Sequence, residues 1–282
     1  EQCDGVRCDM AILLINRIFR ETWGTRAGRE PREEYWTEII GSVRKRRPGL
    51  VFIAEAYWDL ERELQQQGFD YCYDKRLYDR LLHESAEAVR LHLSGDAGDQ
   101  HGLLRFIENH DEPRAASAFG PARGRAAAVV IATLPGARLF HDGQLEGRRV
   151  RLPVQLGRQP DEAPDPSLQG FYGTLLRAVR DAELRGRAWA PCEISGWPDN
   201  RSCVNLVAWR WERADRRHLV VVNLSGDSSQ GRVQMPGLSL AGRSWRLVDL
   251  LSGDVFERDG DEMTDPGLYV DLQPWGFHVL EF

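Results

Sequence analysis

The chain has 282 residues, of which 42% are hydrophobic and 28% charged, and its formal net charge is −6. This length suits one large domain, or a main domain with a smaller companion, of ordinary globular composition. The mild acidity argues against a nucleic-acid partner and leaves a neutral substrate open. No apolar run of about 18 residues occurs, so the sequence predicts no transmembrane helix and no membrane partner.

The five cysteines are few and scattered along the chain: Cys3, Cys8, Cys72, Cys192 and Cys203. They form no CxxC pair and show no metal-ligand spacing, so the sequence predicts no metal site. This pattern favours a reducing compartment such as the cytoplasm, although one disulfide remains possible.

The first two thirds of the chain alternate helical patterns with short apolar runs. The clearest unit has an apolar helical face from Tyr35 to Val43, with Pro31 predicted at the first helical position and Pro48-Gly49 as the stop. The run Leu50 to Ala54 then indicates a parallel strand buried on both faces.

Similar units follow this one, which predicts βαβ connections and a parallel sheet. Further strands are expected at 71–73, 103–107 and 138–141, and helices at 77–93, 115–133 (interrupted at Gly120-Pro121) and 168–184, with a loop at 152–166.

The pattern changes near Pro191, where the helical period fades. Short strands separated by turns are expected at 204–211, 219–224, 232–235, 245–250, 268–272 and 277–282. Such regularly spaced strands favour a small antiparallel β-sandwich. The sequence therefore predicts two domains, 1–190 and 191–282.

Three acids follow apolar strand-like runs in the first domain: Asp9, Glu55 and Asp111. In a βα barrel the carboxyl ends of the strands converge on one face, so these acids are expected to meet there. A pair of carboxylates flanking a glycosidic bond is the requirement for sugar hydrolysis. Any one of them alone would more often be a structural helix cap.

Their neighbours have ordinary interpretations when each is taken alone. Arg7 suits a salt bridge, His110 a loop position, and Tyr57 and Trp58 suit packing. Their joint occurrence beside the acids favours a functional site.

Four segments resemble motifs of the α-amylase family, glycoside hydrolase family 13. They are Asp4 to Asp9, Val51 to Glu55, Phe106 to Asp111 and Leu134 to Gly147. The first looks like the nucleophile motif G-x-R-x-D, the second like the acid/base motif, the third like the N-H-D motif, and the fourth like the stretch at the eighth barrel strand. Each is short, but all four occur in the family's order.

The resemblance implies a partial (β/α)8 TIM barrel, about strands 4–8, followed by the family's C-terminal β-sandwich. It also implies a retaining mechanism acting on α-glucosidic bonds of an oligo- or polysaccharide. Asp9 matches the nucleophile, Glu55 the acid/base and Asp111 the acid that grips sugar hydroxyls. Arg7 matches the residue that orients the nucleophile, and His110 matches a hydroxyl-binding group. The predicted substrate-binding set is completed by Asn109, Tyr57 and Trp58.

Two departures from the family pattern carry further expectations. Ile12 and Leu13 stand where many members have Lys and His for the leaving-group side, which disfavours endo-acting amylase activity and leaves exo-glucosidase or glucosyl transfer open. The family's third-strand motif and its inserted loop domain are not found. We therefore expect the 282 residues to be part of a longer chain and, alone, to be poorly soluble and inactive. No cofactor is expected in this chain, with calcium possible in the missing N-terminal part.

Two alternative functions remain open at this stage. One is a metal-dependent hydrolase with ligands Glu108, His110, Asp111 and Glu112, which are too close in sequence to form a full set. The other is an inactive relative that only binds carbohydrate or a partner protein, against which the presence of all three acids argues.

Overall fold

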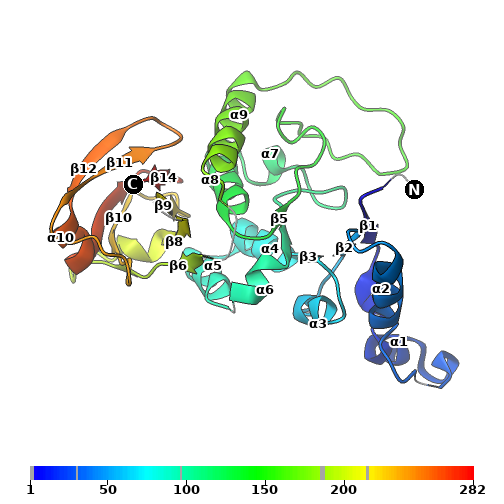
Figure 1. The fold of residues 1–282 in the computed structure, drawn as a ribbon. Helices are drawn as coiled ribbons and strands as arrows, with labels where there is room; N and C mark the ends of the chain where they lie inside the picture. Colours follow the sequence, from blue (N-terminus) through cyan, green and yellow to red (C-terminus); the bar gives the residue numbers. More distant parts are fainter. Residues whose placement is uncertain (1–2, 30, 96, 185–187, 214–215) are drawn as a thin grey trace. The chain divides into compact units, whose positions relative to one another are not determined.

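The computed structural model describes residues 3–29, 31–95, 97–184, 188–213 and 216–282. These residues form two compact units (Figure 1). The first comprises Glu1–Arg76, Gly98–Arg105 and Gly136–Arg138, and the second comprises Leu77–Ala97, Phe106–Pro135 and Leu139–Phe282.

A parallel sheet forms the centre of the first unit. Its strands lie in chain order: β1 (Gly5–Cys8), β2 (Val51–Ala54), β3 (Tyr71–Tyr73), β4 (Leu103–Arg105) and β5 (Ala137–Arg138). Before β5, Gly136 has a φ of 94°, and a Cβ there would collide with the carbonyl oxygen of Leu103. Only glycine therefore allows the chain to enter the sheet beside β4.

Helices connect the strands of this sheet. They are α1 (Asn16–Trp23), α2 (Tyr35–Arg46), α3 (Glu61–Gln66), α4 (Lys75–His83), which continues into the second unit, and α6 (Ala97–His101). Short 3-10 helices occupy Ala11–Leu14 and Gly24–Ala27. One apolar cluster joins α2 and α3 to the sheet, with Ile40 and Leu64 almost completely buried against Phe52 and Cys72. Burial of these side chains, rather than helix propensity, stabilises the helices on the sheet.

The second unit combines helices with antiparallel sheets. Its helices are α5 (Ala86–Leu93), α7 (Ala115–Ala118), α8 (Pro121–Thr133), α9 (Pro166–Asp181) and the short α10 (Gly260–Glu262). A 3-10 helix lies at Ser202–Asn205, and a π-helical turn spans Met263–Gly267. Residues Ala126 to Thr133 of α8 are all buried. This part of the helix carries apolar side chains on every side, as a helix enclosed in a core does.

Two antiparallel sheets complete this unit. A six-stranded sheet has the order β12-β11-β14-β9-β8-β6, and a three-stranded sheet has the order β13-β10-β7. The strands are β6 (Trp189–Pro191), β7 (Ile194–Ser195), β8 (Leu206–Arg213), β9 (Arg216–Asn223), β10 (Ser229–Val233), β11 (Ser244–Asp249), β12 (Val255–Asp259), β13 (Leu268–Leu272) and β14 (Phe277–Glu281). Their inward residues form one buried apolar cluster that includes Leu219, Val221 and Trp245.

Hydrogen bonds attach these sheets to the helices of the same unit. Trp211 on β8 donates its indole N–H to the carbonyl of Thr133 at 2.8 Å. Arg90 on α5 donates to the carbonyls of Val204 and Leu206, both at 2.7 Å. Helices α5 and α8 therefore share a unit with the C-terminal strands, and the sequence boundary at 190 stays a prediction.

The predicted fold class is confirmed, with five parallel strands separated by helices and antiparallel sheets after them. Several predicted helix boundaries were wrong. The second helix begins at Tyr35 rather than at Pro31, because the Glu34 side chain instead accepts the backbone N–H of Asn16 at 2.9 Å. The predicted helix 77–93 is two helices, because Ser85 is extended.

Other differences concern strands. The strand expected at 138–141 is shorter and ends at Arg138. Strands β6, β7 and β12 were not predicted, because they are short or lie beside turns. All five cysteines are free thiols. Within the described part of the chain, no helix is long and apolar enough to cross a membrane.

Candidate active site

Two predicted catalytic residues follow neighbouring strands in the first unit. β1 and β2 pair in parallel with Cys8 opposite Ala54, so Asp9 and Glu55 leave the sheet side by side. The backbone N–H of Glu55 donates to the carbonyl of Cys8 at 3.1 Å, which extends the pairing by one step. The strand-end rule therefore holds for this pair of acids.

Arg7, on β1, contacts both carboxylates. It forms a hydrogen-bonded ion pair with Asp9, and its Nη2 lies 3.0 Å from Oε1 of Glu55 in an ion pair without hydrogen-bond geometry. Its guanidinium carbon also lies 5.5 Å from the centre of the Tyr73 ring. Burial alone would lower the pKa of Arg7, but the hydrogen bonds with Asp9 and Tyr73 and the charge of Glu55 outweigh it and raise that pKa. Arg7 is therefore a fixed cation between two acids.

Glu55 is held by two further donors. The backbone N–H of Met10 donates to Oε2 at 2.6 Å, and the Tyr57 hydroxyl donates to Oε1 at 2.9 Å. The Glu55 side chain is 5% exposed, whereas that of Asp9 is 82% exposed. One acid is thus fixed and enclosed within this unit, and the other is open to solvent.

The two predicted aromatic residues differ in their surroundings. Tyr57 is half-buried and bonded to Glu55. Trp58 is 66% exposed and has a φ of 60°, in the left-handed region. The structure thus brings together Arg7, Asp9, Glu55 and Tyr57, and leaves Trp58 with its ring towards solvent.

The remaining predicted site residues lie in the second unit, on the loop that follows β4. The Asn109 side-chain oxygen accepts the backbone N–H groups of Asp111 at 2.8 Å and Glu112 at 3.0 Å, an Asx turn that shapes this loop. His110 Nε2 lies 3.1 Å from a carboxylate oxygen of Asp111, and both side chains are partly exposed. The structure brings these three residues together, and their meeting with Asp9 and Glu55 stays a prediction.

A buried cluster that we call the Glu108 clasp supports this loop. Glu108 Oε1 lies 2.6 Å from Arg114 Nη1 and 3.2 Å from His141 Nδ1, and its Oε2 accepts the backbone N–H of Ala115 at 2.7 Å. Arg114 also donates to the carbonyl of Asp142 at 2.6 Å. The clasp therefore ties the segment before Asn109 to α7 and to the loop after β5.

The clasp also bears on the metal alternative. Of its four proposed ligands, Glu108 is already paired with Arg114 and His141 and is only 1% exposed. No group of three or more His, Cys, Asp or Glu side chains arranged to hold a metal ion is found among the described residues. The residues present therefore do not fit the metal-dependent hydrolase.

Some residues around the candidate site were not foreseen. Tyr73 ends β3 and faces Arg7, and Asp74, directly after it, pairs with the fully buried Arg105 on β4. Burial and the nearby Arg138 lower the pKa of Arg105 to about 9. Applying the strand-end rule to β3 would have found Tyr73 and Asp74. The members of the Glu108 clasp carry no local sequence signal.

The two positions that depart from the family pattern belong to the core of the first unit. Ile12 is fully buried in its apolar cluster, and Leu13 packs against that cluster. Neither offers a polar group to a sugar.

Comparison with known proteins agrees with these features. No family model matches the chain. The alpha-amylase MalA of Haloarcula japonica is 28% identical over 273 residues, a match that covers 92% of this chain and 36% of that protein. The chain thus spans about a third of the length of this curated relative.

Solved structures give the same result at the level of the fold. An alpha-amylase from Lactobacillus plantarum superposes with a TM-score of 0.68 at 18% identity, over 99% of this chain and 62% of that one. The noncanonic maltogenic alpha-amylase AmyB of Thermotoga neapolitana gives 0.67 at 17% identity, over 99% and 61%. The Nostoc punctiforme debranching enzyme gives 0.65 at 16% identity, over 100% and 57%.

The chain therefore has part of the fold of the α-amylases, five parallel strands of a βα barrel and a C-terminal β domain. Its four motifs and its curated relative make it similar to the α-amylase family, glycoside hydrolase family 13.

Proposed function

We propose that the protein is a retaining glycoside hydrolase or transglycosylase that acts on α-glucosidic bonds. The observation that carries this proposal is the contact of Arg7 with both Asp9 and Glu55 at the ends of two paired parallel strands. Two carboxylates on neighbouring strand ends, with a cation between them, form the arrangement that a two-step displacement needs.

In the first step, a carboxylate oxygen of Asp9 attacks the anomeric carbon. The bond from that carbon to the glycosidic oxygen breaks, and Glu55 gives its proton to the leaving oxygen. In the second step, Glu55 takes a proton from water, or from an acceptor sugar hydroxyl, and the resulting oxygen nucleophile attacks the same carbon. Asp9 leaves as a carboxylate, and the anomeric configuration is retained.

The contacts in the first unit suit these roles. Arg7 orients the Asp9 carboxylate through their hydrogen-bonded ion pair. Met10 N–H and the Tyr57 hydroxyl fix both oxygens of Glu55, so that its carboxyl group has one orientation. A catalytic acid must be held in place for its proton to reach the leaving oxygen.

Asp111 and His110 bind sugar hydroxyls in this proposal, and Asn109 shapes their loop. Asp111 follows β4, a strand of the same parallel sheet, by six positions in the chain. The role of these residues is proposed from the resemblance of this segment to the N-H-D motif.

The substrate proposed is an oligo- or polysaccharide of α-linked glucose. Related structures include an α-amylase from Geobacillus thermoleovorans in complex with acarbose and the Nostoc punctiforme debranching enzyme soaked with acarbose. The apolar Ile12 and Leu13 favour exo-acting hydrolysis or glucosyl transfer over endo-acting cleavage. The proposal needs no cofactor in this chain, so activity of the full-length protein should not depend on any metal held by residues 3–282.

The roles of the two acids can be separated in the full-length protein by the leaving group. Glu55→Gln should lose most activity on maltose but still release fluoride from α-glucosyl fluoride in a rapid first step, because that leaving group needs no proton. Asp9→Asn should lose activity on both substrates, and Asp59→Asn, an exposed acid of the same unit, should lose neither. Equal losses for Glu55→Gln on both substrates would contradict the acid/base assignment.

A further inference from the structure

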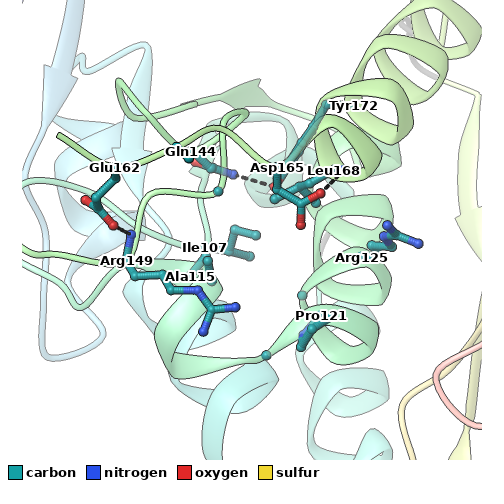
Figure 2. Close-up of a pocket in the computed structure, with 15 residues that line it drawn as sticks. Ile107, Ala115, Pro121, Arg125, Gln144, Arg149, Glu162, Asp165, Leu168 and Tyr172 are labelled. Carbon is teal, nitrogen blue, oxygen red and sulfur yellow. Dashed lines mark hydrogen bonds between the residues drawn. The ribbon is translucent and has the colours of Figure 1, made fainter.

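The second unit contains a cavity of about 320 Å³ (Figure 2). Its walls come from α7, α8, the start of α9 and the loop between β5 and α9, and none of the predicted catalytic or substrate-binding residues lines it. This volume lies at the lower end of the range for small-molecule sites. We call it the α8–α9 cavity.

Small residues create the space. Ala115, Ala116, Gly120 and Gly124 line the side of α7 and α8, and Ile107 adds an apolar floor. Gly120 has a φ of 72°, which a larger residue adopts only with strain, so this corner stays open. The cavity thus offers an apolar surface against which the C–H groups of a ligand can pack.

A buried hydroxyl group at the cavity has a hydrogen to donate. The Gln144 side-chain oxygen accepts the backbone N–H of His141 at 3.1 Å, which orients the amide so that its Nε2 donates to the Tyr172 hydroxyl at 3.0 Å. The Tyr172 oxygen therefore acts as an acceptor there, and its own hydrogen has no acceptor among the described residues. Tyr172 is 2% exposed, and a buried donor without an acceptor is unfavourable. This site calls for a ligand acceptor.

The rim of the cavity presents a cation. The backbone of Arg149 is fixed on both sides, because its N–H donates to Glu162 at 2.7 Å and its carbonyl accepts the Ser117 hydroxyl at 2.9 Å. Its guanidinium makes no hydrogen bond or ion pair with the residues that the structure describes. Figure 2 shows this side chain extending along the cavity wall towards Ala115.

The rim also presents an acceptor. Asp165 caps α9, and its Oδ1 accepts the backbone N–H groups of Ser167 at 2.9 Å and Leu168 at 3.1 Å. The other oxygen, Oδ2, has no partner in the described part of the chain. Figure 2 shows Asp165 facing the cavity from the side opposite Pro121.

The charges that line the cavity cancel, because Arg125 and Arg149 are matched by Glu162 and Asp165. A net anion or cation would therefore gain no overall electrostatic attraction, and a purely apolar ligand would leave the Tyr172 hydrogen unmet. A neutral polyol satisfies all three features, since each hydroxyl both donates and accepts and the ring carbons are apolar.

We propose that the α8–α9 cavity is a second carbohydrate site, which takes one or two sugar rings. A ring hydroxyl accepts from Tyr172, and outer hydroxyls bond Arg149 and Asp165 Oδ2. We assign this site to binding alone, with the carboxylates of Glu162 and Asp165 each accepting backbone N–H groups. The choice of glucose units as the ligand rests on the proposed function, whereas the neutral polyol class rests on the cavity alone.

The test uses calorimetric titration of maltose into the full-length protein with Asp9→Asn, so that the sugar is not consumed. Two binding events are expected. Gly124→Met should remove one of them by filling the cavity, since a Cβ at Gly124 meets only the Phe119 Cβ at 3.7 Å. Tyr172→Phe, which removes only the hydroxyl, should weaken the same event about fivefold to tenfold.

The matched control is Gly173→Met, an exposed glycine on α9 that does not line the cavity and has open space around it. It should leave both events intact. A crystal of the Asp9→Asn protein soaked in maltose should show sugar beside Tyr172 and Arg149. Water alone in the cavity of that crystal, or two events that persist in Gly124→Met, would overturn the proposal.

The same experiments distinguish failure of the proposed catalytic function from failure of the cavity proposal. If the protein with Asp9 intact cleaves no α-glucoside, but maltose binding still depends on Gly124 and Tyr172, the catalytic proposal fails and the cavity proposal stands. Binding of acetate or phosphate in the cavity in place of maltose would overturn the neutral polyol assignment.

Discussion

The two units contain charge clusters of opposite design. In the first, the cation Arg7 lies between two acids, and Asp9 is largely exposed. In the second, the acid Glu108 lies between Arg114 and His141, and both Glu108 and Arg114 are buried. Exposed ion pairs contribute little to stability, whereas removing one partner of a buried pair is costly. We therefore expect the Arg7 cluster to matter for chemistry and the Glu108 clasp for the fold of its loop.

The largest expected effect is on stability. Glu108→Gln leaves Arg114 buried without its carboxylate, so the free energy of unfolding should fall by about 3–5 kcal/mol. Chemical denaturation of the full-length protein measures this loss. Glu84→Gln is the control, because Glu84 is exposed and lies 3.7 Å from Arg80, and it should cost less than about 1 kcal/mol. Similar small losses of stability in both variants would contradict the structural role of the Glu108 clasp.

Arg7→Met should give the opposite result, with a large effect on rate and a small one on stability. Loss of the cation beside Asp9 and Glu55 should lower kcat/KM about 10²-fold to 10³-fold. Unfolding free energy should fall by less than in Glu108→Gln, because Glu55 keeps the Met10 N–H and the Tyr57 hydroxyl as donors and Asp9 is open to solvent. Arg17→Met removes an exposed ion pair of the first unit, with Glu63 at 3.0 Å, and should leave kcat/KM unchanged. A stability loss as large as that of Glu108→Gln would contradict the contrast.

A smaller effect is the pH dependence of stability that a second buried pair, His218 and Glu281, should cause. His218 is 1% exposed and lies 2.9 Å from Glu281. Burial lowers the pKa of His218 below its ordinary 6.5, helped by Arg216 and opposed by Glu281. The folded protein then binds this proton more weakly than the unfolded chain, so stability is full above pH 6.5 and falls as the pH drops below it.

Melting temperatures between pH 7.5 and pH 5 test this dependence. His218→Gln should flatten the fall of the melting temperature below about pH 6.5, while the exposed His83→Gln should leave the fall unchanged. An unchanged slope in His218→Gln would show that other groups cause it.

The sequence alone was sufficient to predict one of the two charge clusters, the one around Arg7. Arg7, Asp9 and Glu55 stand at the ends of apolar runs, and the meeting of parallel strand ends follows from the fold class alone. The Glu108 clasp could not be predicted from the sequence, because Glu108 and His141 are 33 positions apart and His141 lies in a loop without periodicity. Helix ends were also missed where a side chain contact decided them, as at Glu34.

The α8–α9 cavity shows the same limit. Its donors, Tyr172 and Gln144, belong to different elements, and the orientation of Gln144 depends on the backbone of His141. Small residues such as Ala116 and Gly124 are ordinary helix residues in the sequence. Only their arrangement in space reveals an opening.

The central claim is that Asp9 forms a covalent bond to the sugar. The full-length protein should be incubated with 5-fluoro-α-glucosyl fluoride, which slows the second step, and then digested for mass spectrometry. We predict one glycosyl adduct, on the peptide that contains Asp9, and none when Asp9 is replaced by Asn. An adduct on another residue, or turnover that yields the inverted anomer without any adduct, would contradict the account.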